Sequence, residues 1–257
     1  IYTYSPTFKL LAKRKFKPEF PLEYLMALDA DNYVFTYSFI WTDQEVSFVD
    51  LKNQQAVNTN YEGTISGNSM AHACFYHIGE RFYFIPDGLN YYFYQIDTKE
   101  KKLVPMMYLD FGDAEVKAEG LPGQAGGKRT DSDEERREIT KDATERYQYL
   151  KKSNNMLPLL KFFNDDYVYA YLAKTDRGYG SHFMYNRKQK KGFLIKEGEP
   201  FIMYPCFGIV DNVLLSICEP DLVHRVVDRK LMSSEEIRKM EALAEDDNPV
   251  ILKYYLK

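Results

Sequence analysis

The four histidines are the residues best suited to metal binding or acid–base catalysis, and their spacing matches no known motif. His72, His77, His182 and His224 include no i, i+4 pair and no HExxH sequence. Those patterns place two imidazoles on one face of a helix around a zinc ion. The histidine spacing therefore predicts no local zinc site.

The nucleophilic side chains are equally isolated. Cys74, Cys206 and Cys218 are odd in number and lie in apolar surroundings, which fits neither a disulfide framework nor a zinc site. We predict that they are small, buried hydrophobic residues. The chain has no GxSxG motif, and the glycine-rich segment GLPGQAGGK at 120–128 lacks the spacing of a phosphate-binding loop. Local motifs therefore predict no catalytic centre.

Residue types that suit ligand binding fall on the segments between predicted strands. An aromatic ring beside Asp, Asn and Arg side chains can stack on a sugar ring while the polar groups bond to its hydroxyls. The candidate ligand-binding residues are Trp41, Asp43, Asn68, His72, Asp87, Asn90, Asp176, Arg177, Tyr179, His182, Tyr204, His224 and Arg225. An ordinary structural role is the alternative for each, above all for His72 and His182, which border predicted strands.

The composition is that of a folded, strand-rich chain. Its 257 residues are 45% hydrophobic and include 22 Tyr and 17 Phe, and aromatic residues favour pleated, half-buried surfaces. The formal charge is −4 and the two signs are mixed along the chain, so nucleic acid is not expected as a partner. No apolar run approaches the ~20 residues of a membrane-spanning helix, so no transmembrane segment is predicted.

Two series of turns recur along the chain with a common period. The first places a polar residue after an aromatic strand, at Ser5, Asp50, Asp97 and Asn186. The second places a tight turn before an apolar strand, at Asp31, Gly79, Asp165 and Asp211. Both series keep a spacing of about 45 residues, and both contain one surplus of about 40 residues, which indicates a structural repeat with one insertion.

Alternation within the repeat places four short strands in each unit. Tyr33, Phe35 and Tyr37 lie on one face of a predicted strand, with Val34 and Thr36 on the other. The inner strands are thus expected to be buried on both faces, whereas the outer strands are polar. A four-stranded antiparallel unit of about 45 residues has the size of a propeller blade.

The predicted fold is an all-β propeller of four-stranded antiparallel blades, with two helical insertions. We predict a single domain over 1–257. Its parts are a partial blade at 1–17, blades at about 20–62, 63–112, 156–200 and 201–257, and a glycine-rich loop plus helix at 113–153. The number of predicted strands is not a multiple of four, as a closed ring of four-stranded blades requires, and the chain starts within a strand, so we expect part of the propeller to precede Ile1.

The two insertions carry helix signals. Ser132 and Glu135 form a capping box before an apolar stripe with helical spacing, and Ser233 and Glu236 do the same before a second helix. The helix within 113–153 either lies on the surface of the propeller or acts as a lid over one of its faces.

Four segments carry a family resemblance. They are IYTYSPTFKLLAKRKF at the start, LDADNYVFTYS, DNVLLSI and the ending EDDNPVILKYYLK. The chain resembles the six-bladed β-propellers of gut Bacteroidetes, which are related to TolB-like and NHL-like propellers. The resemblance implies export to the periplasm or cell surface, often with a lipid anchor, and most such proteins have no assigned activity.

Three functions stay open at this point. The first is a non-catalytic module that binds a small molecule, glycan or protein partner at the mouth of the propeller channel. The second is a metal-assisted hydrolase or lyase, in which oxygen atoms from several blades hold a calcium ion in the channel. The third is an interaction scaffold. No cofactor is predicted, with calcium as the open alternative.

Overall fold

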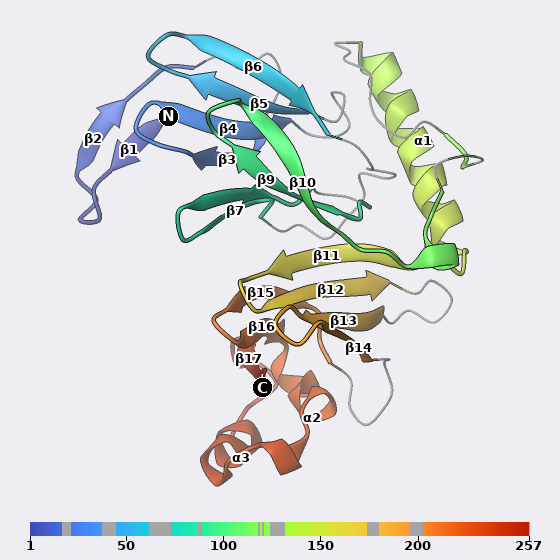
Figure 1. Cartoon of the computed structure of the whole chain (residues 1–257). Coiled ribbons are helices and arrows are strands. Elements are labelled where there is room, and N and C mark those ends of the chain that lie inside the picture. The colour runs from blue at the N-terminus through green and yellow to red at the C-terminus, as the bar shows by residue number, and fades with distance from the viewer. Residues whose placement is uncertain are drawn as a thin grey trace. The chain divides into compact units, whose positions relative to one another are not determined.

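The computed structural model divides the chain into two compact units (Figure 1). It describes residues 1–16, 22–37, 45–61, 73–86, 89–117, 119, 121–123, 132–173, 180–195 and 203–256. The first unit comprises the described residues within Ile1–Asn68, Ala73–Leu109 and Leu121–Arg146, and the second comprises those within Asp110–Gly120 and Tyr147–Lys257.

The strands of the first unit form a hairpin and two four-stranded antiparallel sheets. Their bounds are β1 (Tyr2–Tyr4), β2 (Leu10–Lys13), β3 (Leu22–Ala27), β4 (Asn32–Tyr37), β5 (Glu45–Asp50), β6 (Gln55–Asn60), β7 (Phe75–Ile78), β8 (Arg81–Phe84), β9 (Tyr92–Asp97) and β10 (Lys102–Tyr108). The hairpin pairs β1 with β2, and the sheets have the orders β3-β4-β5-β6 and β7-β8-β9-β10. Each strand thus pairs with its neighbours in sequence, which makes both sheets simple meanders.

Strand β4 is buried on both faces, as its alternation predicts. Tyr33 and Phe35 on one face belong to a core cluster that Phe16 also contacts. Val34 on the other face belongs to a second cluster, in which residues of the neighbouring sheet such as Phe84 take part. Because successive side chains of a strand point to opposite faces, one aromatic strand can serve two cores.

The turn after β5 shows what the first sequence series encodes. One carboxylate oxygen of Asp50 accepts the backbone N–H groups of Lys52 and Asn53, both at 2.9 Å. Gln54 then closes the turn with a φ of 53°. An Asp side chain that satisfies the N–H groups of its own turn stabilises the tight reversal between two antiparallel strands.

The same turn recurs at the predicted positions. Asp97 accepts the N–H groups of residues two and three positions later at 3.0 Å, and Lys101 follows with a φ of 52°. Asn186 accepts the N–H of the third residue after it at 2.9 Å, and Lys190 follows with a φ of 53°. The period in the sequence is therefore a period of hairpin turns.

At Asp31 and Asp165, the second sequence series marks turns whose capping residues lie slightly upstream of the predicted positions. Asp29 accepts the N–H groups of Asp31 and Asn32 at 2.8 Å. Asn164 accepts the N–H of Asp166 at 2.9 Å and that of the following residue at 2.7 Å. In both cases the prediction located the turn but not the side chain that stabilises it.

The second unit contains a four-stranded and a three-stranded antiparallel sheet, with short helices near the C-terminus. Its elements are η1 (Gly112–Ala114), β11 (Leu157–Phe163), β12 (Tyr167–Ala173), β13 (Gly180–Asn186), β14 (Lys191–Ile195), β15 (Cys206–Val210), β16 (Val213–Cys218), η2 (Pro220–Leu222), α2 (Val223–Val226), η3 (Arg229–Leu231), α3 (Ser234–Glu241) and β17 (Val250–Tyr255). The sheet orders are β11-β12-β13-β14 and β15-β16-β17.

The long helix α1 (Asp133–Lys151) lies within the predicted insertion. It begins after Ser132, whose hydroxyl oxygen accepts the backbone N–H of Glu135 at 3.4 Å. Three acidic residues occupy its first turn, where they interact favourably with the helix dipole. The residues of α1 up to Arg146 belong to the first unit.

A buried arginine holds the segment before α1 against the helix. Arg146 is 4% exposed, and its Nε donates to the carbonyl oxygen of Pro122 at 3.0 Å, while Nη2 donates to that of Gly123. Gly123 has a φ of 67°, and a Cβ there would lie 2.7 Å from the carbonyl oxygen of Asp142. Only glycine allows this close approach. Burial lowers the pKa of Arg146.

Helix α3 carries the capping box that the sequence predicts. Ser233 Oγ accepts the N–H of Glu236 at 3.2 Å, and the Glu236 carboxylate accepts the N–H of Ser233 at 2.7 Å. Met240 packs from this helix against a cluster that includes Cys218 and Leu252. The second helical insertion is thus attached to the three-stranded sheet.

We expect Ser233→Ala to lower the free energy of unfolding by about 1 kcal/mol, because it removes the acceptor for an N–H group that has no partner within the helix. The measurement is urea denaturation followed by circular dichroism. Ser234→Ala, one residue later, is the control and should change stability by less than about 0.5 kcal/mol. Equal losses in the two variants would contradict the capping role.

The predicted six-bladed propeller is wrong. The described strands form five separate antiparallel sheets of two, four, four, four and three strands, and none of these sheets closes or curls. In the first unit, Phe48 of one four-stranded sheet and Phe84 of the other lie in the same core cluster, an arrangement like that of a sandwich. The repeat specifies the meander, whereas contacts between sheets decide how successive meanders pack.

Candidate functional site

The structure describes five of the thirteen residues predicted to bind a ligand. These are Asn90, His182, Tyr204, His224 and Arg225. The other eight lie outside the described residues: Trp41, Asp43, Asn68, His72, Asp87, Asp176, Arg177 and Tyr179.

Asn90 and Tyr204 have structural roles. Asn90 is fully buried, and its side-chain oxygen accepts the backbone N–H of Tyr92 at 2.7 Å. Tyr204 is half-buried and packs against the cluster that contains Val223 and Val226. Asn90 is thus closed from solvent, whereas Tyr204 is partly exposed.

His182 is part of a buried hydrogen-bond chain in the second unit. Its Nδ1 lies 2.8 Å from the hydroxyl of Tyr169, which accepts the backbone N–H of Cys206 at 3.1 Å. The Tyr169 hydroxyl therefore donates its proton to Nδ1, and the opposite ring nitrogen is left to donate to the backbone of Met203. Neutral imidazole offers one donor and one acceptor, which matches these two partners.

Burial controls the chemistry of this chain of groups. His182 is 1% exposed, and desolvation lowers its pKa to about 4. Burial also raises the pKa of Tyr169 well above its usual value and that of the Cys206 thiol to about 12. All three groups are therefore neutral near pH 7 and satisfy one another within the core.

The neighbouring glycine completes the packing around His182. The ring of Tyr171 lies over Gly180, so a Cβ at that position would lie 2.4 Å from the ring. The same ring lies 5.3 Å from the His182 ring, centroid to centroid. The sequence analysis placed His182 at the border of a strand, whereas the structure places it within β13, paired with strands on both sides, as a core residue.

Of the five predicted site residues that the structure describes, His224 and Arg225 are exposed. They are adjacent on α2, a single helical turn, and both are exposed while Val223 and Val226 beside them are buried. Among the residues that the structure describes, no other predicted site residue joins His224 and Arg225.

The cysteines are buried, as the sequence predicts. Cys74, Cys206 and Cys218 are free thiols that are each at most 1% exposed. Burial raises the pKa of Cys218 to about 11. A thiol that is protonated at neutral pH and closed from solvent is a poor nucleophile.

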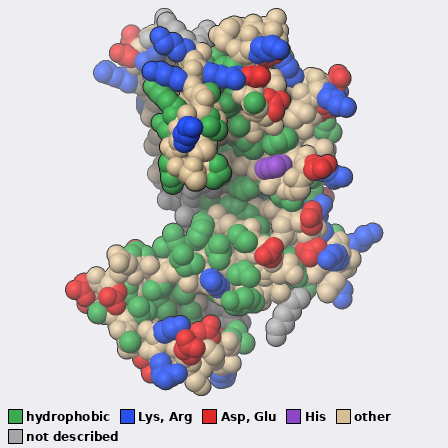
Figure 2. All heavy atoms as spheres, turned by 90° about the vertical axis from the view of Figure 1, so that its left-hand side faces the viewer, with side chains coloured by type: hydrophobic (Ala, Val, Ile, Leu, Met, Phe, Trp, Pro, Cys, Tyr) green, Lys and Arg blue, Asp and Glu red, His purple; other side chains and the backbone are tan. Residues whose placement is uncertain are grey.

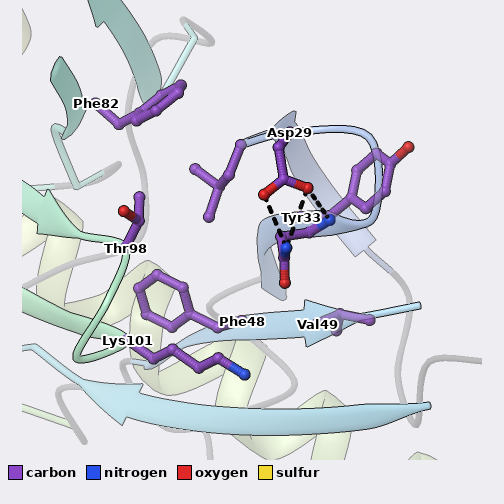
Figure 3. Close-up of a pocket in the computed structure, with 9 residues that line it drawn as sticks. Asp29, Tyr33, Phe48, Val49, Phe82, Thr98 and Lys101 are labelled. Atoms are coloured by element: carbon purple, nitrogen blue, oxygen red, sulfur yellow. Dashed lines mark hydrogen bonds between the residues drawn. The ribbon is translucent and has the colours of Figure 1, made fainter. Parts of the chain in front are cut away.

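The first unit contains a groove of about 150 Å³ that the sequence analysis missed (Figure 3). We call it the sheet groove, and its lining residues are Leu28, Asp29, Asn32, Tyr33, Phe48, Val49, Phe82, Thr98 and Lys101. Figure 3 shows Phe82 and Phe48 on opposite sides of it, with Thr98 and Lys101 along one flank and Asp29 along the other.

The floor of the sheet groove is apolar and its rim is polar. Phe48 is 2% exposed, whereas Phe82 is half-buried and stacks on His77 at 4.6 Å. On the rim, Asp29 already accepts hydrogen bonds from the turn that follows it. Thr98 on the opposite flank is exposed, so its hydroxyl is open to a ligand.

Lys101 links the two sheets that border the groove. Its carbonyl oxygen accepts the hydroxyl of Thr59 at 2.8 Å. Hydrogen bonds from the Asn53 backbone and side chain keep the pKa of Asp50 below its usual value, and the charge of Lys101 lowers it further. The ammonium group of Lys101 therefore lies near the Asp50 turn of the neighbouring sheet.

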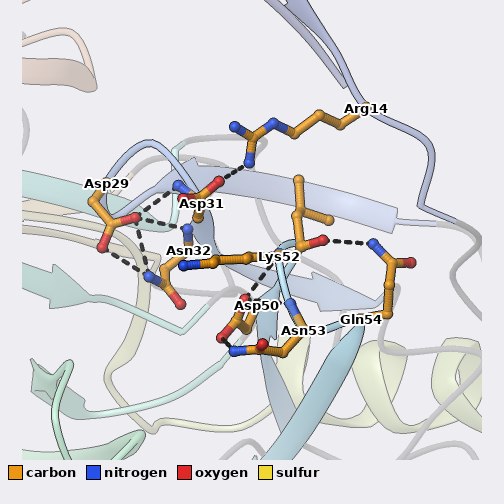
Figure 4. A network of polar contacts seen from close by, with 9 residues as sticks. Arg14, Asp29, Asp31, Asn32, Asp50, Lys52, Asn53 and Gln54 are labelled. Atoms are coloured by element: carbon orange, nitrogen blue, oxygen red, sulfur yellow. Dashed lines mark hydrogen bonds and ion pairs between the residues drawn. The ribbon is translucent and has the colours of Figure 1, made fainter.

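A second hollow of about 380 Å³ opens beside the same turns (Figure 4). We call it the basic hollow, and its lining residues are Arg14, Lys15, Asp31, Leu51, Lys52 and Gln54. Arg14 forms an ion pair with Asp31 through one guanidinium nitrogen, and Figure 4 shows the others directed away from it.

Sequence reasoning missed both sites because it searched the other end of each sheet. The candidate residues came from the loops between the second and third strands of each predicted unit and from the segments that link one unit to the next. The groove and the hollow lie at the turns between first and second and between third and fourth strands, which meet at one end of a meander. The two series of turns were the signal that could have located them.

The described helices include none that is long and apolar enough to cross a membrane. Within the described ranges, no group of three or more His, Cys, Asp or Glu side chains converges as metal ligands would.

No protein-family model matches this chain, and no curated protein matches it. Among solved structures, that of a "Putative exported protein" from Bacteroides fragilis matches with a TM-score of 0.64 and 16% sequence identity. The match covers 100% of this chain and 71% of the other, and at this identity it concerns the fold. The described strands form five separate sheets, none of which closes into a propeller, so the predicted membership of the six-bladed, TolB-like or NHL-like propeller family is wrong.

Proposed function

We propose that this chain is a non-catalytic binding protein and that the sheet groove holds one ring of a small sugar ligand. The observation that carries the proposal is the combination of an apolar floor with a polar rim in a groove of about 150 Å³. Ligand sites typically have mostly apolar walls and a few placed polar groups.

The size and the chemistry of the groove agree on the ligand class. Cavities of about 150 Å³ are known to hold one six-membered ring. Phe82 offers an aromatic surface, while Thr98 and Lys101 offer a hydroxyl and an ammonium group to ring hydroxyls. Asp29 is occupied by its own turn, so it shapes the rim rather than serving as a base.

Burial of the reactive groups favours binding over catalysis. His182 is neutral and enclosed, and the three thiols are buried. None of these four groups lines the sheet groove, whose titratable lining residues are Asp29, Tyr33 and Lys101.

We also propose that the protein acts outside the cytoplasm, in the periplasm or at the cell surface. The support for this is the structurally similar Bacteroides fragilis protein, which bears the name "Putative exported protein". Fractionation of the native host, with detection of this chain in the periplasmic or surface fraction, tests the location.

Lys101→Ala should weaken sugar binding about tenfold, because a hydrogen bond from a charged donor contributes about 1.5–3 kcal/mol. Thermal-shift screening of the whole chain against a panel of neutral and acidic mono- and disaccharides identifies the ligand. Isothermal titration calorimetry then measures its Kd for each variant.

Lys190→Ala is the matched control, because Lys190 holds the same turn position with a φ of 53°, against 52° for Lys101, in the other unit. It should leave the Kd unchanged. Absence of any sugar that shifts the melting temperature, or equal losses in the two variants, would overturn the proposal.

A further inference from the structure

The three-stranded sheet of the second unit has an open edge at β17. Its order is β15-β16-β17, so β16 is the one described strand that pairs with β17. At the other end of the sheet, β15 is tied to the neighbouring sheet, because the backbone N–H of Cys206 donates to the Tyr169 hydroxyl of β12 at 3.1 Å. An open edge presents a row of backbone N–H and C=O groups with which another chain can pair.

One hydrogen bond fixes which backbone groups of β17 face this edge. Leu256 donates its backbone N–H to the carbonyl oxygen of Asn212 at 2.8 Å, and the two strands pair from there without a break in register. Because the backbone groups of successive residues point to opposite sides of a strand, every second residue of β17 bonds to β16. The N–H and C=O groups of Ile251, Lys253 and Tyr255 therefore point away from β16, toward the open edge.

The outer strands of the four-stranded sheets carry features that discourage further pairing. β10 contains Pro105, which has no N–H, and its register with β9 is interrupted next to it. β6 has the polar sequence QAVNTN, and β14 begins with Lys191 and Gly192. β17 has the sequence VILKYY, with neither proline nor glycine, and a continuous register. Its edge is therefore suited to accept a strand.

The other sheets indicate what fits this edge. β5, β9 and β13 are the third strands of their meanders, and each pairs with an antiparallel fourth strand. β17 is the third strand of its own meander, and it offers the same kind of edge. The occupant that fits is therefore an extended strand that runs antiparallel to β17.

The face beside the open edge is apolar and exposed. Ile251 and Tyr255 are 61% and 67% exposed, and Ile217, which pairs with Ile251, is 51% exposed. The opposite face is covered, since Leu252 packs with residues of α2 and α3 in a core cluster. Figure 2 shows hydrophobic side chains gathered over the lower part of one face, where the second unit lies. Apolar side chains of an added strand would extend this surface.

The charge of Lys253 selects among possible strands. Lys253 lies between Ile251 and Tyr255 on the apolar face, is exposed, and has no ion-pair partner in the part of the chain that the structure describes. A carboxylate directly across the strand pair would stabilise it, whereas a second lysine would destabilise it. Antiparallel pairing of β17 with a second copy places Lys253 opposite itself, or, after a shift of two residues, opposite Ile251 or Tyr255. A strand with an acidic residue fits better.

We infer that β17 is a docking edge for a partner protein, which adds an extended strand to the three-stranded sheet. The added strand presents apolar side chains to Ile251 and Tyr255 and a carboxylate to Lys253. Main-chain hydrogen bonds supply the affinity in this mode of recognition, and the alternating side chains supply the specificity. The inference is independent of the sheet groove, whose residues belong to the first unit.

The test uses two blocked seven-residue peptides on the whole chain, TVTETVT and TVTKTVT. Each presents Val, the central charged residue and Val on one face of a strand, so that Glu or Lys lies opposite Lys253. The Glu peptide should bind at least about threefold more tightly in low salt, because opposite charges stabilise a strand pair and like charges destabilise it. Fluorescence anisotropy measures both affinities, and the difference should shrink in high salt.

The variant Lys253→Glu should reverse the preference, so that the Lys peptide binds more tightly. Lys191→Glu makes the same charge change on β14, the outer strand of the other sheet of this unit, and should keep the preference of the unmodified chain. Both lysines are exposed, so the fold should persist, which circular dichroism verifies.

Hydrogen exchange followed by NMR locates the bound peptide. The N–H groups of Ile251, Lys253 and Tyr255 should gain protection when the Glu peptide binds. Those of Leu252 and Tyr254 bond to β16 and should be protected with or without the peptide. Protection gained at the edge of β14 instead would overturn the assignment to β17.

Three further outcomes would overturn the inference. They are the absence of binding by either peptide, equal affinities of the unmodified chain for both peptides in low salt, and an unchanged preference in Lys253→Glu. Sedimentation velocity tests the second copy as the occupant. A dimer of the free chain that dissociates when the Glu peptide is added would assign the edge to self-association rather than to a partner protein.

Discussion

Replacing Phe84 by alanine should lower the free energy of unfolding by about 3–5 kcal/mol, the cost typical of removing a buried phenylalanine. Phe84 is 0% exposed. Its ring lies 5.0 Å from that of Tyr61 and 5.2 Å from that of Phe75, centroid to centroid. It also packs in the cluster that contains Val34 and Phe48 of the other sheet. The cavity would therefore open between the two sheets that border the sheet groove.

Guanidinium denaturation monitored by circular dichroism measures the change. Phe193→Ala is the control, because Phe193 is 51% exposed on β14. It should cost about 1 kcal/mol or less. A loss for Phe84→Ala no larger than that of the control would mean that the two sheets of the first unit do not share a core.

Acidification should destabilise the chain by up to about 3 kcal/mol through His182. Its pKa is lowered to about 4 in the folded protein, whereas the unfolded residue titrates near 6.5. Between these values the unfolded state binds the proton and the folded state does not. The stability is therefore complete above pH 6.5, decreases as the pH falls toward 4, and changes no further below it.

The measurement is the free energy of unfolding at pH 7, 6, 5 and 4 for the unmodified chain and for His182→Gln. The variant should be less stable at pH 7, because the hydroxyl of Tyr169 loses its partner. The stability difference between the two proteins should then shrink toward pH 4. His224→Gln, which removes an exposed histidine, should follow the unmodified chain at every pH.

Parallel pH profiles for the unmodified chain and His182→Gln would contradict the buried, neutral state of His182. A lower stability of His182→Gln at pH 7 would not by itself distinguish a neutral, buried imidazole from a side chain that only fills space in the core. The pH dependence of the stability difference does so, because the two proteins differ in this imidazole alone and share every other group that titrates across this range.

The residues that were predicted to bind a ligand show why residue type alone misplaces a site. His182 and Asn90 have side chains that suit a ligand, and each satisfies polar groups of the core. Thr98 and Lys101 are ordinary turn residues in the sequence. They become candidates because a turn of one sheet comes to lie beside a strand end of another, and no local pattern encodes that proximity.

The local structure follows from the sequence itself. An Asp or Asn side chain binds the N–H groups of its own hairpin turn, as Asp50 and Asp97 do. Alternating residues such as those of β4 define two faces, and a Ser with a Glu three residues later starts α3. These interactions span a few residues, so each segment carries all the partners that it needs.

Only the tertiary structure decided how the meanders pack. A four-stranded meander buried on both faces can join a ring or a layered stack, and the same strand pattern serves either arrangement. The choice depends on contacts such as that of Phe48 with the cluster around Phe84, between residues far apart in the sequence. Turn chemistry and alternation therefore specified the sheets, whereas packing between sheets created the groove and set the burial of His182.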